Sequence, residues 1–387
     1  MKVAMLGSLR PLRGISAFCQ PLAESVSRLV PVEFVSFKAM YPRFLYPGDS
    51  LTDETAPLPA GPNLTVRRTL AWYNPFGWAF EGLRVRADVV HAQHWSLPLV
   101  PVYLTVLALA RLRGARIVLT IHNTAPHTRS WAFVPALRAL ARLAHCCVLH
   151  SEYGREQAVE LLGIPPGRVR VIALGAWSGV PAPAADRAAA RVRLGLPDGA
   201  PVVLCFGALR PYKGVDVLMR AFAQALAAVP EARLVVAGKP WTDWAPYQAL
   251  AEELGISGRL HAFPRFIPEA EVADFFAAAD LVVLPYAQFD AQSGVGMVAL
   301  GYGKPLLVTR VGGLPELVSD PRFVVEPNDA AMLADRLALC LREPGVLERM
   351  QADAAERARA FSWERVAVAT VSLYEELCRP ASSRSQG

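Results

Sequence analysis

Short apolar runs alternate with amphipathic segments along most of this chain, in two successive series. The candidate strands of the first series are residues 2–7, 32–37, 88–93, 116–121 and 146–151. The candidate helices between them are residues 16–29, 97–112, 132–144 and 153–162. Such alternation is typical of a parallel, doubly wound α/β sheet whose strands are covered on both faces. Residues 40–80 are rich in Pro, Gly and aromatic side chains and poorly periodic, so we predict a long excursion outside the sheet.

The second series of apolar runs starts at residue 201, after a Pro- and Ala-rich stretch at 175–190. Because 387 residues exceed one average core, we expect two domains, at 1–178 and 190–360. The stretch between the two series has the composition of an interdomain connection. A terminal helix and a tail, 361–387, complete the chain.

The composition is that of a rather apolar globular protein, with 53% hydrophobic and 19% charged residues. The start, MKVAMLGSLRP, lacks the long apolar core of a signal peptide, so we expect a cytoplasmic protein. The six cysteines show no paired metal-ligand spacing, which suits reduced thiols in that compartment.

The longest apolar stretch, Leu97–Ala110, is shorter than the roughly 20 residues that span a bilayer. It is either a buried helix of the first domain or a peripheral docking element at the inner face of an anionic membrane. The second interpretation depends on the arginines that follow it or lie on a later apolar helix, which are Arg111, Arg113, Arg116, Arg138 and Arg142. The net charge of +6 fits anionic lipids or phosphate-bearing substrates. The sequence shows no stripe of interleaved basic and aromatic residues, so we expect no nucleic-acid partner.

Residues 201–222 carry the strongest chemical signal. The apolar run Val202–Phe206 predicts a buried strand, and the helical spacing after Val215 predicts an amphipathic helix. Arg210 and Lys213 stand between them, where the carboxyl end of a parallel strand meets a helix, and two fixed cations there suit an anionic ligand. Only five of the 40 basic residues are lysines, so Lys213 favours a phosphate site over solvated loop charges.

In four segments the chain resembles the retaining glycosyltransferases of the GT4 family. These are IVLTIHN at 117–123, GALRPYKG at 207–214, ADLVVLPYAQFDAQSGVGMVALGYGKPLLVTRVGGLPELV at 279–318 and FSWERVAVATVSLYEEL at 361–377. The resemblance implies the GT-B fold, in which two Rossmann-like, doubly wound domains face each other across a cleft. It also implies a nucleotide-sugar donor on the C-terminal domain, an acceptor on the N-terminal domain, and a terminal helix that crosses back to the latter.

In such an enzyme, negative charge develops on the departing diphosphate, so fixed cations and backbone N–H groups lower the barrier. We expect Arg210 and Lys213 to supply the cations. The backbone donors are expected at the start of a helix, where a close approach to phosphate is easiest, and comprise Gln292, Ser293, Gly294 and Val295. The alternative is an ordinary glycine-containing strand–helix turn.

The remaining candidates come from the resemblance. Gly14 lies on the loop after the first strand, which in the family closes over the donor phosphates. Gly207 opens the segment similar to the family's donor-phosphate motif, and Gly238 lies where the nucleotide packs. His122 follows a strand at the point where the family has a histidine near the transferring carbon; the alternative is a satisfied, partly buried histidine. His91 and His94 do not form a metal pair, because residues three apart in a strand point to opposite faces.

The second signature block departs from the family pattern. Where the family has two glutamates seven residues apart, this chain has Asp290 and Val298, so the usual ribose acceptor is missing or is replaced, for example by Gln292. We expect Asp290 near the donor sugar, and Phe266 and Ile267 on the loop that contacts the base.

We therefore predict an enzyme of glycan or polysaccharide synthesis, a retaining hexosyltransferase without a cofactor or a metal. Its partners would be a nucleotide diphosphate sugar and a saccharide or lipid-linked acceptor. A degenerate relative that binds nucleotide or glycan without turnover is the alternative, motivated by Val298. Another GT-B enzyme, such as a phosphorylase or a sugar-nucleotide epimerase, is a third.

Overall fold

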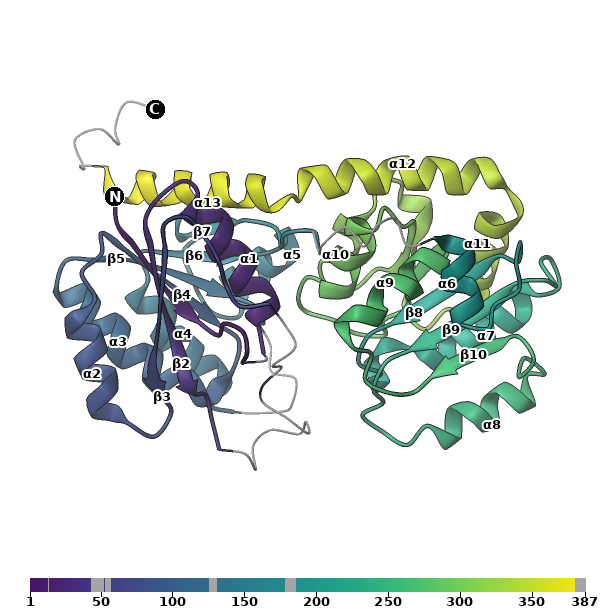
Figure 1. The fold of residues 1–387 in the computed structure, drawn as a ribbon, viewed down its shortest axis with the longest axis horizontal. Coiled ribbons are helices and arrows are strands. Elements are labelled where there is room, and N and C mark those ends of the chain that lie inside the picture. Colours follow the sequence, from purple (N-terminus) through teal and green to yellow (C-terminus); the bar gives the residue numbers. More distant parts are fainter. Residues whose placement is uncertain (13, 43–51, 53–56, 125–130, 178–185, 380–387) are drawn as a thin grey trace. The chain divides into compact units, whose positions relative to one another are not determined.

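The computed structural model describes residues 1–12, 14–42, 52, 57–124, 131–177 and 186–379 (Figure 1). The chain forms two compact units, the first made of Met1–Gly175 with Trp363–Gly387 and the second of Ala176–Ser362. Half of the predicted connection at 175–190 lies outside the described residues, which leave out 178–185.

The first unit is built on a sheet whose described strands all run parallel, in the order β3-β2-β1-β4-β5-β6-β7. The strands are β1 (Val3–Gly7), β2 (Val32–Ala39), β3 (Leu64–Ala71), β4 (Val89–His94), β5 (Arg116–Ile121), β6 (Cys146–Leu149) and β7 (Val169–Val171). The chain order reverses between β1 and β4. At such a switch point the loops after neighbouring strands diverge and leave room for a ligand.

The prediction that residues 40–80 lie outside the sheet was wrong. β3 pairs with β2 at the edge of the sheet, and α2 (Pro75–Arg84) follows it. An edge strand is only half covered, so β3 lacks the continuous apolar run that marks the central strands and carries Arg67 and Arg68 instead. Residues 43–51 and 53–56 of this stretch lie outside the described residues.

Helices cover both faces of the first sheet. One face packs against α1 (Ser16–Ser27) and α13 (Trp363–Cys378), so the end of the chain completes the core that its beginning starts. The other face packs against α3 (Val100–Leu112) and α4 (Phe133–Leu143). α2 lies against α3, and α5 (Glu152–Glu160) leads towards β7.

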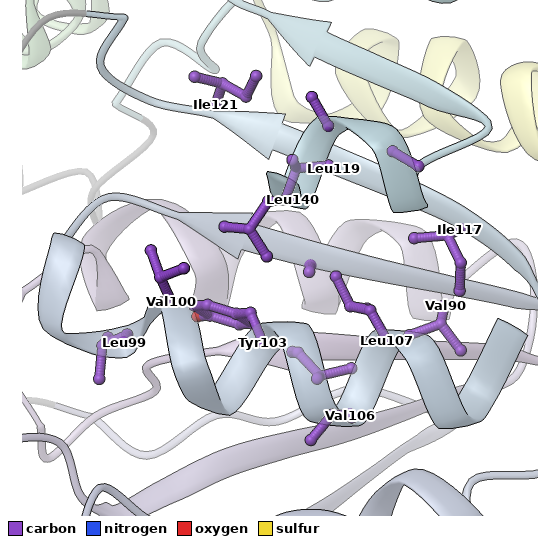
Figure 2. Close-up of a cluster of buried hydrophobic side chains, with 14 of the residues drawn as sticks. Val90, Leu99, Val100, Tyr103, Val106, Leu107, Ile117, Leu119, Ile121 and Leu140 are labelled. Carbon is purple, nitrogen blue, oxygen red and sulfur yellow. The ribbon is translucent and has the colours of Figure 1, made fainter. Parts of the chain in front are cut away.

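The long apolar stretch forms α3, which is part of the core. Figure 2 shows Val100, Tyr103 and Leu107 directed from this helix at the side chains of the sheet. The Tyr103 hydroxyl donates to the backbone oxygen of Gln93 at 2.9 Å, which joins the helix to β4. The buried-helix interpretation of this stretch is therefore the correct one. In the part of the chain that is described, no helix is long and apolar enough to cross a membrane.

The second unit has a smaller parallel sheet in the order β10-β9-β8-β11-β12-β13. Its strands are β8 (Val202–Phe206), β9 (Arg233–Ala237), β10 (Leu260–Phe263), β11 (Leu281–Leu284), β12 (Leu306–Thr309) and β13 (Val324–Val325). Its helices are α6 (Arg187–Arg193), α7 (Val215–Ala225), α8 (Ala245–Glu253), α9 (Glu269–Ala278), α10 (Gly294–Gly301), α11 (Ala330–Arg342) and α12 (Pro344–Ala360). The chain order reverses between β8 and β11, so this sheet also has a central switch point.

We predict that Gly214→Ala destabilises the second unit far more than Gly255→Ala. Both glycines adopt a left-handed conformation, with φ of 64° and 66°. A Cβ on Gly214 would lie 2.1 Å from the backbone oxygen of Pro285, whereas a Cβ on Gly255 would meet nothing within 4 Å. The free energy of unfolding in urea should fall by about 1 kcal/mol for Gly255→Ala and by several times that for Gly214→Ala. Equal losses would contradict this packing.

Candidate functional site

The switch point of the second sheet brings together the loops after β8 and β11. Gly207 follows β8 with φ of 99°, and its N–H donates to the backbone oxygen of Ala237 at 2.9 Å. A Cβ on Gly238 would lie 2.0 Å from the Gly207 oxygen, so the loops after β8 and β9 approach closely only because residue 238 is glycine. These two predicted site residues shape the backbone around the site.

Lys213 lies inside this region, with its side chain directed at the end of β8. The residue is 5% exposed, and its ammonium donates to the backbone oxygen of Phe206 at 3.4 Å. The same Nζ lies 5.0 Å from the centre of the Tyr286 ring. A Cβ on Gly207 would lie 3.0 Å from this Nζ and 2.9 Å from Cγ2 of Val295, which places the ammonium beside the start of α10.

Lys213 stays charged at neutral pH although it is buried. Burial lowers the pKa of this lysine, but Tyr286, Cys205 and Tyr212 outweigh burial and raise the pKa above its ordinary value. No described carboxylate forms an ion pair with Lys213. A buried charge without a counter-charge is costly, so the site favours binding of an anion.

Arg210 provides a second cation three residues earlier, as the residue that precedes the short 3₁₀ helix Pro211–Lys213. Its Cζ lies 3.9 Å from the centre of the Trp241 ring. Stacking fixes the plane of the guanidinium and leaves its N–H edges available for a phosphate. Trp241 was missed from the sequence, although its place after β9, the neighbour of β8, was a usable signal.

The start of α10 supplies backbone donors. The Ser293 hydroxyl accepts from the Gly296 N–H at 3.2 Å and lies 3.3 Å from the Tyr286 hydroxyl. The amide oxygen of Gln292 accepts from the Ser293 N–H at 3.1 Å, so both side chains shape the helix start. The N–H groups of Gly294 and Val295 have no partner among the described residues, and they lie at the positive end of the helix dipole.

The other predicted residues of this unit lie around this centre. Asp290 is half-buried near Tyr212; burial raises the pKa of this tyrosine, and Asp290 adds to the rise. Val298 is a half-buried residue of α10. Ile267 is buried after β10, and Phe266 is half exposed.

In the first unit, His122 and His150 follow β5 and β6 at matching positions. The strands pair Val118 with Cys146, and the same register places the two histidines side by side. Nδ1 of His122 lies 3.2 Å from Nε2 of His150. His150 was missed, although this repeat of a histidine after neighbouring strands is visible in the sequence.

The two histidines belong to a buried polar chain. Nδ1 of His150 donates to the backbone oxygen of Ile172 at 2.9 Å, and Nε2 of His122 lies 3.1 Å from the amide of Gln93. That amide lies 3.1 Å from Nε2 of His91, whose Nδ1 lies 2.6 Å from the Tyr374 hydroxyl of α13. The chain therefore runs from the terminal helix to the end of β5.

Burial keeps these histidines neutral. It lowers the pKa of His91 to about 3 and that of His150 to about 4, and burial together with the neighbouring histidines lowers the pKa of His122 well below 6.5. Neutral rings are satisfied when Tyr374 donates to His91, the His91 Nε2–H is shared between Thr120 Oγ1 at 2.7 Å and Gln93, Gln93 donates to His122, and His122 donates to His150. In the structure the Gln93 nitrogen faces His91 and its oxygen faces His122, so this order requires the amide to be turned over, which its heavy-atom positions equally allow. His122 then carries its proton on Nδ1 and presents Nε2 as an acceptor.

Two further residues lie at the same edge of the first sheet. Gly14 has φ of 97°, and a Cβ there would lie 3.5 Å from the Ser8 hydroxyl and 3.6 Å from the Trp95 indole nitrogen. His94, at the end of β4, is 1% exposed, and neither ring nitrogen has a partner among the residues described. Burial lowers the pKa of His94 to about 4.

We predict that His94→Leu reduces the pH dependence of stability. The unfolded chain binds a proton at His94 below the ordinary pKa of 6.5, but the folded chain does so only near 4. The stability that the neutral ring contributes is thus present above pH 6.5 and is lost as the pH falls towards 4. The difference in unfolding free energy between pH 7 and pH 5 should shrink by about 2 kcal/mol in the variant. An unchanged difference would mean that the folded protein protonates His94 at pH 5.

Comparisons with known proteins agree with this arrangement. Residues 13–175 match the family model described as glycosyl transferase 4-like domain, and residues 186–360 match glycosyl transferases group 1. A D-inositol 3-phosphate glycosyltransferase of Nocardioides is 35% identical over 74% of this chain and 67% of its own length. One of Thermobispora bispora is 31% identical over 80% of this chain and 73% of its own length. The chain spans about half the length of two Corynebacterium relatives, 51% and 52%.

Solved structures show the fold. The sucrose-phosphate synthase of Thermosynechococcus elongatus is 21% identical with a TM-score of 0.71, over 97% of this chain and 98% of its own. The HepE protein of Anabaena, solved in complex with UDP and glucose, is 18% identical with a TM-score of 0.72, over 97% of this chain and 100% of its own. The predicted GT-B class is therefore confirmed. The chain belongs to the GT4 family of glycosyltransferases.

Proposed function

We propose that this glycosyltransferase transfers a hexose, with retention, from a nucleotide diphosphate sugar to a saccharide or a lipid-linked saccharide in glycan or polysaccharide synthesis. The observation that carries the proposal is Lys213, a buried ammonium that no described carboxylate neutralises. A diphosphate supplies the missing negative charge. The family resemblance supports retention.

The residues around Lys213 account for the chemistry of the donor half. When the bond between the anomeric carbon and the diphosphate breaks, negative charge grows on the leaving oxygen. Lys213 meets this charge as a fixed point charge, and Arg210 binds phosphate oxygens through its guanidinium edge. The N–H groups of Gly294 and Val295 add two preorganised donors. None of these groups has to change its protonation state during the reaction.

In the first unit, we assign His122 to the acceptor hydroxyl. In the proton order given above, the Nδ1 proton of His122 is donated to His150, so its Nε2 is an acceptor that the turned Gln93 amide satisfies and that a substrate hydroxyl can take over. Gly14 and Trp95 flank the same edge of the sheet, where the indole N–H is a further donor. The names of the Nocardioides and Thermobispora relatives support adding inositol 3-phosphate to the acceptors that are tested.

One observation favours the alternative of a binding protein without turnover. Val298 stands on α10 where the family has a carboxylate for the ribose, and a valine side chain cannot accept a hydrogen bond. The two functions differ in one measurable product, the free nucleotide diphosphate.

We predict that one donor of a nucleotide-sugar panel releases its nucleotide diphosphate, and that Lys213→Met lowers the rate about 100-fold or more. The rate is measured as free diphosphate in the presence of saccharide acceptors. Arg220→Gln, which removes an exposed arginine of α7 from the same unit, is the matched control and should keep the wild-type rate. Turnover unchanged in Lys213→Met would refute the role of this lysine, and tight donor binding without release favours the binding protein.

We further predict that Val298→Glu raises the affinity for the nucleotide about tenfold, because a carboxylate at this position accepts from a ribose hydroxyl. The measurement is a calorimetric titration with the nucleoside diphosphate. Val298→Leu is the control, since it adds volume without an acceptor. Equal affinities of Val298→Glu and Val298→Leu would show that the ribose lies elsewhere.

A further inference from the structure

Helix α2 carries a stripe of exposed apolar side chains. Phe76 is 86% exposed and Phe80 60%, and Leu83 is also exposed. Their spacing of four and three residues places them on one face of the helix. Trp72 and Tyr73 extend this α2 stripe into the turn before the helix, and both are exposed. Large apolar side chains gathered in this way mark an interaction surface.

The opposite face of α2 is firmly packed, so the stripe does not result from loose attachment of the helix. A Cβ on Gly82 would lie 2.9 Å from Cβ of Leu109 and 3.1 Å from Cα of Val106, which shows how closely α2 approaches α3. Glu81 is buried and lies 2.7 Å from Nη1 of Arg67 on β3. The α2 stripe is therefore the solvent side of a fixed helix.

The charges around the α2 stripe are positive. Cζ of Arg84 lies 5.9 Å from the Phe80 ring, and Arg86 is exposed just after the helix. The contact of Gly82 with α3 brings the last turns of the two helices together, and α3 ends in exposed Leu112 followed by exposed Arg113. Residues 72–86 and 97–116 contain one acidic side chain, Glu81, which is buried in its pair with Arg67.

We propose that the α2 stripe docks this protein on an anionic lipid surface. A helix that presents aromatic and aliphatic side chains, with arginines beside them, inserts its apolar face among acyl chains while the arginines bind anionic headgroups. The charge pattern argues against a second copy of this chain, because two such faces would bring arginines together.

The α2 stripe starts at the edge of the sheet that also carries His122. Trp72 follows the end of β3 and His122 follows the end of β5, and parallel strands end at the same edge of their sheet. Arg84 and Arg86 lie at the far end of α2, before β4 begins, so only the Trp72 end of the stripe adjoins the edge that carries His122. If the proposed function holds, this edge would receive an acceptor whose sugar is attached to a membrane lipid.

Co-sedimentation with vesicles tests the docking. Wild-type protein should sediment with vesicles of equal phosphatidylglycerol and phosphatidylcholine, at least tenfold more than with phosphatidylcholine alone. The double variant Phe76→Ser/Phe80→Ser and the double variant Arg84→Gln/Arg113→Gln should each lose at least tenfold of this binding. Val192→Ser, which removes an apolar side chain that is 79% exposed on α6, is the control and should bind as the wild type does.

Absence of wild-type binding, or binding retained by the phenylalanine variant, would overturn the proposal. So would a wild-type dimer, measured by light scattering, that the phenylalanine variant converts to monomers without any effect of vesicles. Release of nucleotide diphosphate with a water-soluble acceptor is measured in parallel. Vesicle binding without such release would support the docking and count against the proposed function. Release without vesicle binding would support the proposed function and count against the docking.

Discussion

The ammonium of Lys213 is held in the interior of the second unit by the backbone oxygen of Phe206 and the ring of Tyr286. Both groups stabilise a positive charge, but neither cancels it. The surrounding backbone allows this position only because Gly207, Gly214 and Gly238 permit approaches that a side chain would block. The fold thus keeps the Lys213 ammonium buried, and the attraction to a bound diphosphate offsets the free-energy cost of removing that ammonium from water. Arg210 and the start of α10 are arranged around the same point.

The first unit differs from the second in that its interior holds a cluster of neutral histidines. A chain of hydrogen bonds from Tyr374 to the backbone of Ile172 satisfies His91, His122 and His150 without a net proton. Because Tyr374 lies on α13, the end of the polypeptide helps to fix the orientation of the His122 ring. The two units therefore offer complementary chemistry, with fixed positive charge in the second and a neutral acceptor in the first.

The sequence was sufficient to predict the parts that depend on strand ends. Lys213 and Ser293 follow β8 and β11, and apolar runs locate such strands reliably. It was not sufficient for β3, because an edge strand is half exposed and its pattern resembles that of a loop. Nor did it identify Trp241 or Gln93, whose roles depend on which way a side chain points. The α2 stripe was also missed, since its meaning depends on which face of the helix packs against α3.

The account depends most on the claim that Lys213 binds the terminal phosphate of the donor nucleotide. A calorimetric comparison of a nucleoside diphosphate with its monophosphate, on the wild type and on Lys213→Met, isolates this contact. The account predicts that the diphosphate binds the wild type at least tenfold more tightly than the monophosphate does, and that the variant binds both equally. The same tenfold preference in the variant would contradict it.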